Sequence, residues 1–185
     1  MIKNGIGGSN TKTGLKFEGQ TDLADFIRKQ IGYKIEAKTG YTGNGFDVCY
    51  LDNHVGLILK KHGLYVYLEQ HGIEWQQILS KKLLPDDSLF VILKNTFYII
   101  ECKFQQVEGS VDEKLQTCDF KKKQYQKLLS QINCKVEYIY LLSEWFRKPK
   151  YKDVLDYIIS VNCSYYFEYL PLTELGLPVP ASEST

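Results

Sequence analysis

Three charged residues near the middle of the chain have types and a spacing that suit chemistry on a phosphate. Asp86 follows Pro85, and Glu101 and Lys103 lie fifteen and seventeen residues further along. Mg²⁺ prefers oxygen ligands and keeps several waters, so one or two carboxylates and a substrate phosphate suffice to bind it. A neighbouring lysine can orient or deprotonate a water and stabilise charge that builds on phosphorus. The three side chains therefore fit a hard-cation site.

The residues that separate these charges are expected to form a buried hairpin. Segments 88–93 and 96–100 are almost wholly apolar, which is typical of strands covered on both faces. Residues 94–95 are expected to form a two-residue turn, because asparagine tolerates positive φ. Leu93 would then pair with Thr96.

The turn sets which charged residues meet. Across a turn of that length Ser88 lies opposite Glu101 and Asp86 lies opposite Lys103, and directly opposed residues share a face of the sheet. Asp86, Glu101 and Lys103 are therefore expected on one face, with Asp87 on the other. A slip of one residue would exchange the two aspartates, so both remain candidate ligands.

A cluster of two carboxylates and an ammonium also has a structural interpretation, an ion-pair network at the rim of a sheet. A glutamate and a lysine two residues apart are common on exposed strands. Here they follow a Pro-Asp pair and two apolar strands, and this context favours the metal site.

At these positions the sequence resembles the PD-(D/E)XK signature of the restriction-endonuclease-like nucleases. The resemblance is carried by Pro85-Asp86, the interval that follows, and Glu101-Cys102-Lys103. The order of helix, strands, helix and strand across residues 15–142 is also similar to the family core. The resemblance implies a mixed α/β fold, in which a central mixed β-sheet is flanked by helices in the order αβββαβ.

The resemblance also implies an activity, that of an Mg²⁺-dependent, site-specific type II restriction endonuclease of a restriction–modification system. Asp86 and Glu101 would hold the metal, and Lys103 would position the attacking water. Cleavage would leave 5′-phosphate and 3′-hydroxyl ends on double-stranded DNA. The alternatives are a structure-directed nuclease (a resolvase, repair or phage recombination enzyme) and a non-catalytic nucleic-acid-binding module.

The residues before this hairpin are expected to supply an arm, a helix and two strands. Residues 1–14 are rich in small polar residues and form a flexible leader or an arm that touches DNA. A helix is expected over 15–31, with Glu18 either a helix-dipole carboxylate or an accessory metal-site acid. A polar loop is expected over 33–45, strands over 46–50 and 55–60, and short helices over 61–70 and 74–82.

The polar stretch after the hairpin is expected to lie beside the site. If the second strand continues, Gln105 joins the face of Glu101 as an accessory residue. A helix capped by Asp119 would precede a strand over 135–142, and a helix over 151–161 and a strand over 164–169 would follow. The candidate DNA-binding residues of the whole chain are Lys12, Lys16, Lys114, Gln116, Lys121, Lys122, Lys123 and Arg147.

The length, the net charge and the cysteines limit the number of domains, the class of protein and the cellular compartment. A chain of 185 residues fits one domain, with the core over 15–142 and an extension over 143–185 for dimer or DNA contacts. The net charge of +1 argues against a protein that coats DNA by charge alone. The five scattered cysteines indicate reduced thiols and a cytoplasmic protein, and no signal peptide or membrane span is expected. Because one site cuts one strand, a homodimer is expected.

Overall fold

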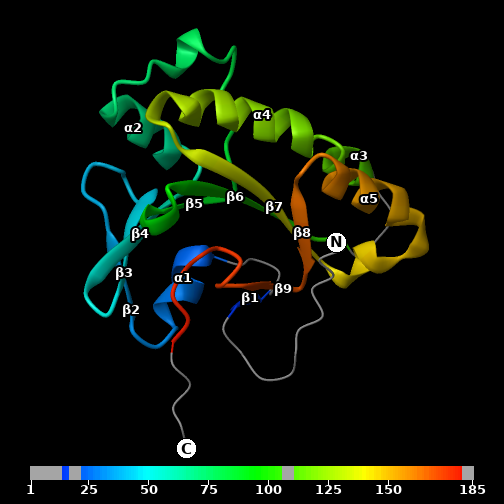
Figure 1. Ribbon diagram of the computed structural model, residues 1–185, viewed down its shortest axis with the longest axis horizontal. Coiled ribbons are helices and arrows are strands. Elements are labelled where there is room, and N and C mark those ends of the chain that lie inside the picture. The colour runs from blue at the N-terminus through cyan, green and yellow to red at the C-terminus, as the bar shows by residue number, and fades with distance from the viewer. Residues whose placement is uncertain (1–13, 17–21, 106–110, 181–185) are drawn as a thin grey trace, which may run out of the picture.

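A seven-stranded sheet forms the centre of the computed structural model, which describes residues 14–16, 22–105 and 111–180 (Figure 1). The strands lie side by side in chain order and alternate in direction as far as the fifth, after which the last two are parallel to it. They are β2 (Tyr33–Ala37), β3 (Gly45–Tyr50), β4 (Asn53–Leu59), β5 (Asp87–Val91), β6 (Thr96–Lys103), β7 (Lys135–Leu142) and β8 (Ser164–Phe167).

Helices cover both faces of this mixed sheet, as Figure 1 shows. One face carries α2 (Gly63–Gln70), α4 (Cys118–Leu129) and α5 (Lys152–Ser160), and the other carries α1 (Leu23–Arg28) and the C-terminal segment. A separate pair of short strands, β1 (Gly14–Lys16) and β9 (Tyr169–Pro171), lies near α1. The remaining elements are short: η1 (Trp75–Gln77), η2 (Ile92–Lys94), α3 (Val111–Leu115), η3 (Ser130–Ile132), η4 (Glu144–Arg147) and η5 (Pro149–Tyr151).

The two faces of β6 belong to different hydrophobic cores. Phe97 and Ile99 pack in the core under α4, and Tyr98 and Ile100 pack in the core over α1. Because successive side chains of a strand alternate, Glu101 continues the face of Phe97 and Ile99. The apolar composition of 96–100 therefore reflects a strand buried on both sides, as expected.

The hairpin of β5 and β6 is confirmed, but its register differs from the expected one. The turn is one turn of 3₁₀ helix, η2, followed by Asn95 in the left-handed region at φ 47°. Val91, and not Leu93, therefore pairs with Thr96. The register is displaced by two residues, and because the side-chain period of a strand is two, Asp86 and Glu101 keep their common face.

The N-terminal expectations need two corrections. The helix expected over 15–31 begins only at Leu23, because Asp22 caps it and accepts a hydrogen bond from the N–H of Ala24 at 2.9 Å. Its expected first residues instead form β1, which pairs with β9. The expected loop over 33–45 includes strand β2, whose exposed polar side chains hide its partnership with β3.

The second half of the chain follows the sequence pattern more closely. The strand expected over 135–142 is β7, and the helix expected over 151–161 corresponds to α5. The strand expected over 164–169 is divided, because Glu168 adopts φ 57° between β8 and β9. Asp119 lies in the first turn of α4, where it pairs with Lys123, and Thr117 occupies the N-cap position.

Three further expectations near helices also change. The expected helix over 74–82 is limited to η1, and the polar stretch after the hairpin includes α3. Lys122, a candidate for DNA contact, is a buried residue of α4, and its ammonium group lies 2.5 Å from the carbonyl oxygen of Asn162 and 3.4 Å from Glu137. It therefore ties α4 to the loop before β8 and is not available to a phosphate.

This arrangement predicts that Lys122→Ala destabilises the fold and that Lys123→Ala does not. Loss of a buried charged hydrogen bond costs about 1.5–3 kcal/mol, whereas an exposed pair such as Lys123 with Asp119 contributes only about 0–1 kcal/mol. Urea unfolding of both variants measures the difference. Equal midpoints for the two variants would contradict the structural role of Lys122.

Candidate active site

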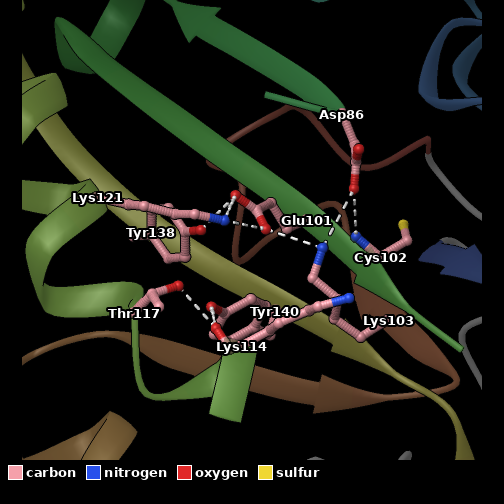
Figure 2. Close-up of polar contacts among 9 residues, drawn as sticks. All are labelled: Asp86, Glu101, Cys102, Lys103, Lys114, Thr117, Lys121, Tyr138 and Tyr140. Atoms are coloured by element: carbon pink, nitrogen blue, oxygen red, sulfur yellow. Dashed lines mark hydrogen bonds and ion pairs between the residues drawn. The ribbon is translucent and has the colours of Figure 1, made fainter. Parts of the chain in front are cut away.

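The candidate site lies at the start of β5 and the end of β6, at the edge of the two hydrophobic cores. Asp86 directly precedes β5, and Glu101 and Lys103 are at the end of β6 (Figure 2). Cys102 points to the opposite face, as strand alternation requires, and its backbone N–H donates to Asp86 Oδ2 at 3.3 Å. The structure thus brings together the three residues that the sequence selected.

Glu101 is buried and held by three donors from three elements. Lys103 Nζ lies 2.9 Å from Oε2, Lys121 Nζ of α4 lies 2.8 and 2.9 Å from the two carboxylate oxygens, and the hydroxyl of Tyr138 of β7 donates at 2.5 Å. Burial by itself raises the pKa of Glu101, but the charges of Lys103 and Lys121 outweigh it and lower the pKa below its ordinary value. The carboxylate is therefore ionised and fixed in orientation.

Lys103 connects the two carboxylates. Its ammonium nitrogen lies 2.9 Å from Glu101 and 3.7 Å from Asp86 Oδ2. Burial lowers the pKa of Lys103, but the Glu101 and Asp86 carboxylates raise it by a larger amount, so the net shift of the pKa is upward. Because the pKa rises, Lys103 carries its proton in this arrangement and acts as a cation.

Asp86 differs from Glu101 in its access to solvent. Its side chain is 53% exposed, whereas that of Glu101 is 5% exposed. An exposed carboxylate beside a buried, ionised one leaves oxygen lone pairs that face water. The pair therefore combines one rigid anion with one that an incoming ligand can reach.

These donors fit Mg²⁺ as judged by their chemistry. Both carboxylates contact the same ammonium group, so they attract positive charge at a shared point. Within the described ranges no cluster of three or more His, Cys, Asp or Glu side chains is placed to hold a metal. An ion that keeps several waters needs only one or two carboxylates, so Asp86 and Glu101 are the residues that would hold it.

The alternative aspartate, Asp87, lies on the other side of the sheet. It is 6% exposed, the N–H of Leu23 donates to its carboxylate, and in the described part of the chain its Oδ1 has no hydrogen-bond partner. Burial raises the pKa of Asp87 to about 7, more than the nearby Lys60 lowers it. This geometry favours Asp86 over Asp87 as the ligand on the Glu101 face.

The other candidate residues occupy different places. Gln105 is buried just beyond the end of β6, and its backbone N–H lies 3.3 Å from Ser143 Oγ, so the strand alternation that would place it on the Glu101 face stops at Lys103. Lys114, Gln116 and Lys123 are exposed, and Arg147 is half-exposed beside Glu144. Lys12 and Glu18 lie outside the described residues, and the structure describes only the backbone of Lys16, within β1.

Sequence reasoning missed the two side chains that hold Glu101 from outside its strand. The sequence predicts Lys121 only as a DNA contact, and it predicts the residue at position 138 only as part of the strand over 135–142. Helical spacing gives a usable signal for Lys121, because it lies one turn before the buried Tyr125 on α4. Nothing in the sequence distinguishes Tyr138 from the other tyrosines.

A comparison with protein-family models places this chain in a known family. The model of the PD-(D/E)XK nuclease superfamily domain matches residues 36–133, slightly more than half of the chain, and the match includes Asp86, Glu101 and Lys103. The chain belongs to the PD-(D/E)XK nuclease superfamily, and its mixed sheet with flanking helices is consistent with that fold. No curated protein and no solved structure gives a significant match.

Superfamily membership supports a nuclease that acts on nucleic acid. Members of the superfamily typically use divalent metal ions. No helix among the described residues is long and apolar enough to cross a membrane.

The raised pKa of Asp87 predicts a pH-dependent difference in stability between the protein and its Asp87→Asn variant. Between the ordinary pKa of 3.8 and about 7 the folded state binds a proton that the unfolded state has lost, so the unfolding free energy falls as pH rises through this window. Asparagine does not titrate, so the Asp87→Asn variant does not lose unfolding free energy at this position as the pH rises. The variant should gain stability relative to the parent across the window, by up to about 4 kcal/mol, from 1.36 kcal/mol per pKa unit.

Urea unfolding at pH 4 and pH 8 in EDTA measures this difference. Subtracting the unfolding free energy of the parent from that of the variant cancels the contributions of the titratable groups that the two proteins share. A difference between variant and parent that stays constant from pH 4 to pH 8 would show that Asp87 titrates normally.

Proposed function

We propose that the protein is an Mg²⁺-dependent endodeoxyribonuclease that cuts double-stranded DNA at specific sites, in the manner of a type II restriction endonuclease. The observation that supports this most directly is the geometry around Lys103, whose ammonium group contacts both the buried Glu101 and the exposed Asp86. A structural ion pair at a sheet rim would not require a glutamate that three donors from β6, β7 and α4 hold away from water.

The roles of the residues follow from their positions. Asp86 and Glu101 hold the metal, which when bound would lower the pKa of a water and neutralise charge on the phosphate. Lys103 orients the attacking water and stabilises the negative charge that develops on phosphorus. Lys121 and Tyr138 are positioning residues, because they act by fixing the carboxylate of Glu101.

The assembly and the products follow from the same proposal. In-line attack of water breaks the bond between phosphorus and the 3′ oxygen and leaves 5′-phosphate and 3′-hydroxyl ends. One site cuts one strand, so cleavage of both strands of a palindromic target requires a two-fold homodimer. All five cysteines are free thiols, which supports a reducing compartment such as the cytoplasm.

Digestion of unmethylated plasmid DNA with Mg²⁺ tests the activity. Discrete bands are expected, and Lys103→Ala should reduce the cleavage rate by about 10²- to 10³-fold, the usual cost of one group that stabilises transition-state charge. Lys34→Ala is the matched control, because Lys34 is an exposed lysine of β2 that pairs with Glu36 of the same strand. A smear would indicate a non-specific or structure-directed nuclease, and an intact plasmid would indicate a binding module.

Metal binding tests the ligands independently of cleavage. Glu101→Gln removes the charge of the carboxylate but keeps its shape, so Mg²⁺ affinity measured by calorimetry should fall at least tenfold. Glu137→Gln is the control, because Glu137 is a half-exposed glutamate of β7 that pairs with Lys122 away from the site. Equal Mg²⁺ affinity in the Glu101 variant and the parent would show that Glu101 is not a ligand.

A further inference from the structure

A cationic recess lies beside the candidate active site, between the loop after β7, the start of α5 and strand β8. Its cavity volume is about 440 Å³. Three cations, one carboxylate and two aromatic rings contribute to its lining: Arg147, Lys148, Lys152, Asp156, Tyr165 and Phe167. Lys152 pairs with Asp156 at 2.7 Å, and Arg147 and Lys148 leave the lining with an excess of positive charge, which favours an anionic occupant.

The sheet register places this recess at a defined distance from the candidate site. Lys103 of β6 is aligned with Leu142 of β7, and Leu142 is aligned with Phe167 of β8. Residues aligned across neighbouring strands share a face, and Leu142 and Phe167 do belong to the same core as the residues under α4. Two strand spacings separate Lys103 from Phe167, which is about 10 Å.

The loop that carries the cations is also anchored to the site strand. The backbone N–H of Ser143, which begins the loop, donates to the carbonyl oxygen of Lys103 at 3.1 Å. Successive phosphates of one strand of B-form DNA rise about 3.4 Å along the helix axis, and their through-space separation is larger because each step also rotates about the axis. A strand with one phosphate at Lys103 therefore brings another, about one or two phosphates away, to the recess.

Arg147 is held ready to bind such a phosphate. Its guanidinium carbon lies 4.1 Å from the centre of the Phe167 ring, and its Nε lies 2.5 Å from a carboxylate oxygen of Glu144. A guanidinium that is already stacked loses little freedom when it forms a bidentate pair with phosphate oxygens. Both side chains of the Arg147–Glu144 ion pair are about half exposed, so the pair contributes little to stability. The other N–H donors of the Arg147 guanidinium are therefore available to phosphate.

We propose that this recess is a backbone-binding subsite, in which Arg147 binds a phosphate of the nucleic acid about one or two nucleotides from the bond that is cut, with Lys148 and Lys152 beside it. The proposal rests on the proposed nuclease function for its choice of partner. It adds a specific cationic contact on the loop after β7 and the start of α5, outside the metal-binding residues.

The salt dependence of binding tests this contact separately from catalysis. Affinity for a fluorescein-labelled DNA duplex is measured by anisotropy with Ca²⁺ in place of Mg²⁺ over a range of salt concentrations. Arg147→Ala should bind several-fold more weakly at low salt, and the slope of log affinity against log salt should become shallower by about 0.9, the contribution of one phosphate contact. Arg147→Lys should keep the slope but recover only part of the affinity, because lysine lacks the stacked, forked geometry.

Arg28→Ala is a closely matched control. Arg28 and Arg147 have side chains that are 48% and 49% exposed, and each pairs with a carboxylate three residues earlier. Arg28 lies on α1, over the opposite core. Its variant should therefore keep the slope and the affinity of the parent, and thermal unfolding of all variants shows whether each is folded.

The outcomes separate this proposal from the nuclease assignment. A parent that binds DNA without cutting it, together with a slope that is shallower by about 0.9 in Arg147→Ala, would support the subsite and overturn the nuclease. A parent that cuts DNA while the variants of Arg147 and Arg28 share its slope would overturn the subsite alone. The subsite would also be overturned if the parent failed to bind DNA, or if Arg147→Ala changed the oligomeric state without changing the slope, since the recess would then contact a second copy of the chain.

Discussion

The site depends on a single ionised carboxylate kept out of water. An isolated carboxylate in the position of Glu101 would take up a proton or move toward solvent, because burial of an uncompensated charge costs several kcal/mol. Lys103, Lys121 and the hydroxyl of Tyr138 prevent this, and each comes from a different element. The relative positions of β6, β7 and α4 are therefore coupled to the charge of one residue.

This coupling explains why the site is located where buried strands end. Along β6 the side chains pass from full burial at Ile99 and Ile100 to the partly exposed Lys103. Glu101 lies at the transition, close enough to the core to be rigid and close enough to Asp86 to share a cation with it.

The sequence predicted the hairpin and the shared face of the three charged residues, and it missed much of what surrounds them. The face was predictable because a register error of two residues preserves side-chain parity, so the error at Asn95 had no effect on it. The pairing of β1 with β9 joins segments more than 150 residues apart, and no local pattern encodes such a contact. Lys121 and Lys122 show the same limit, because adjacent lysines in one run become a site residue and a buried tether through packing alone.

The two aspartates at the start of β5 show how one strand can serve both faces. Asp86 faces the cation shared with Glu101, and Asp87 faces the core over α1, where burial raises its pKa to about 7. Strand alternation separates their environments even though the residues are adjacent. Protonation of Asp87 would relieve the repulsion between neighbouring carboxylates and leave the negative charge at Asp86, on the face where Glu101 and Lys103 lie. The environment of each aspartate, more than its identity, thus decides which one is suited to bind a metal.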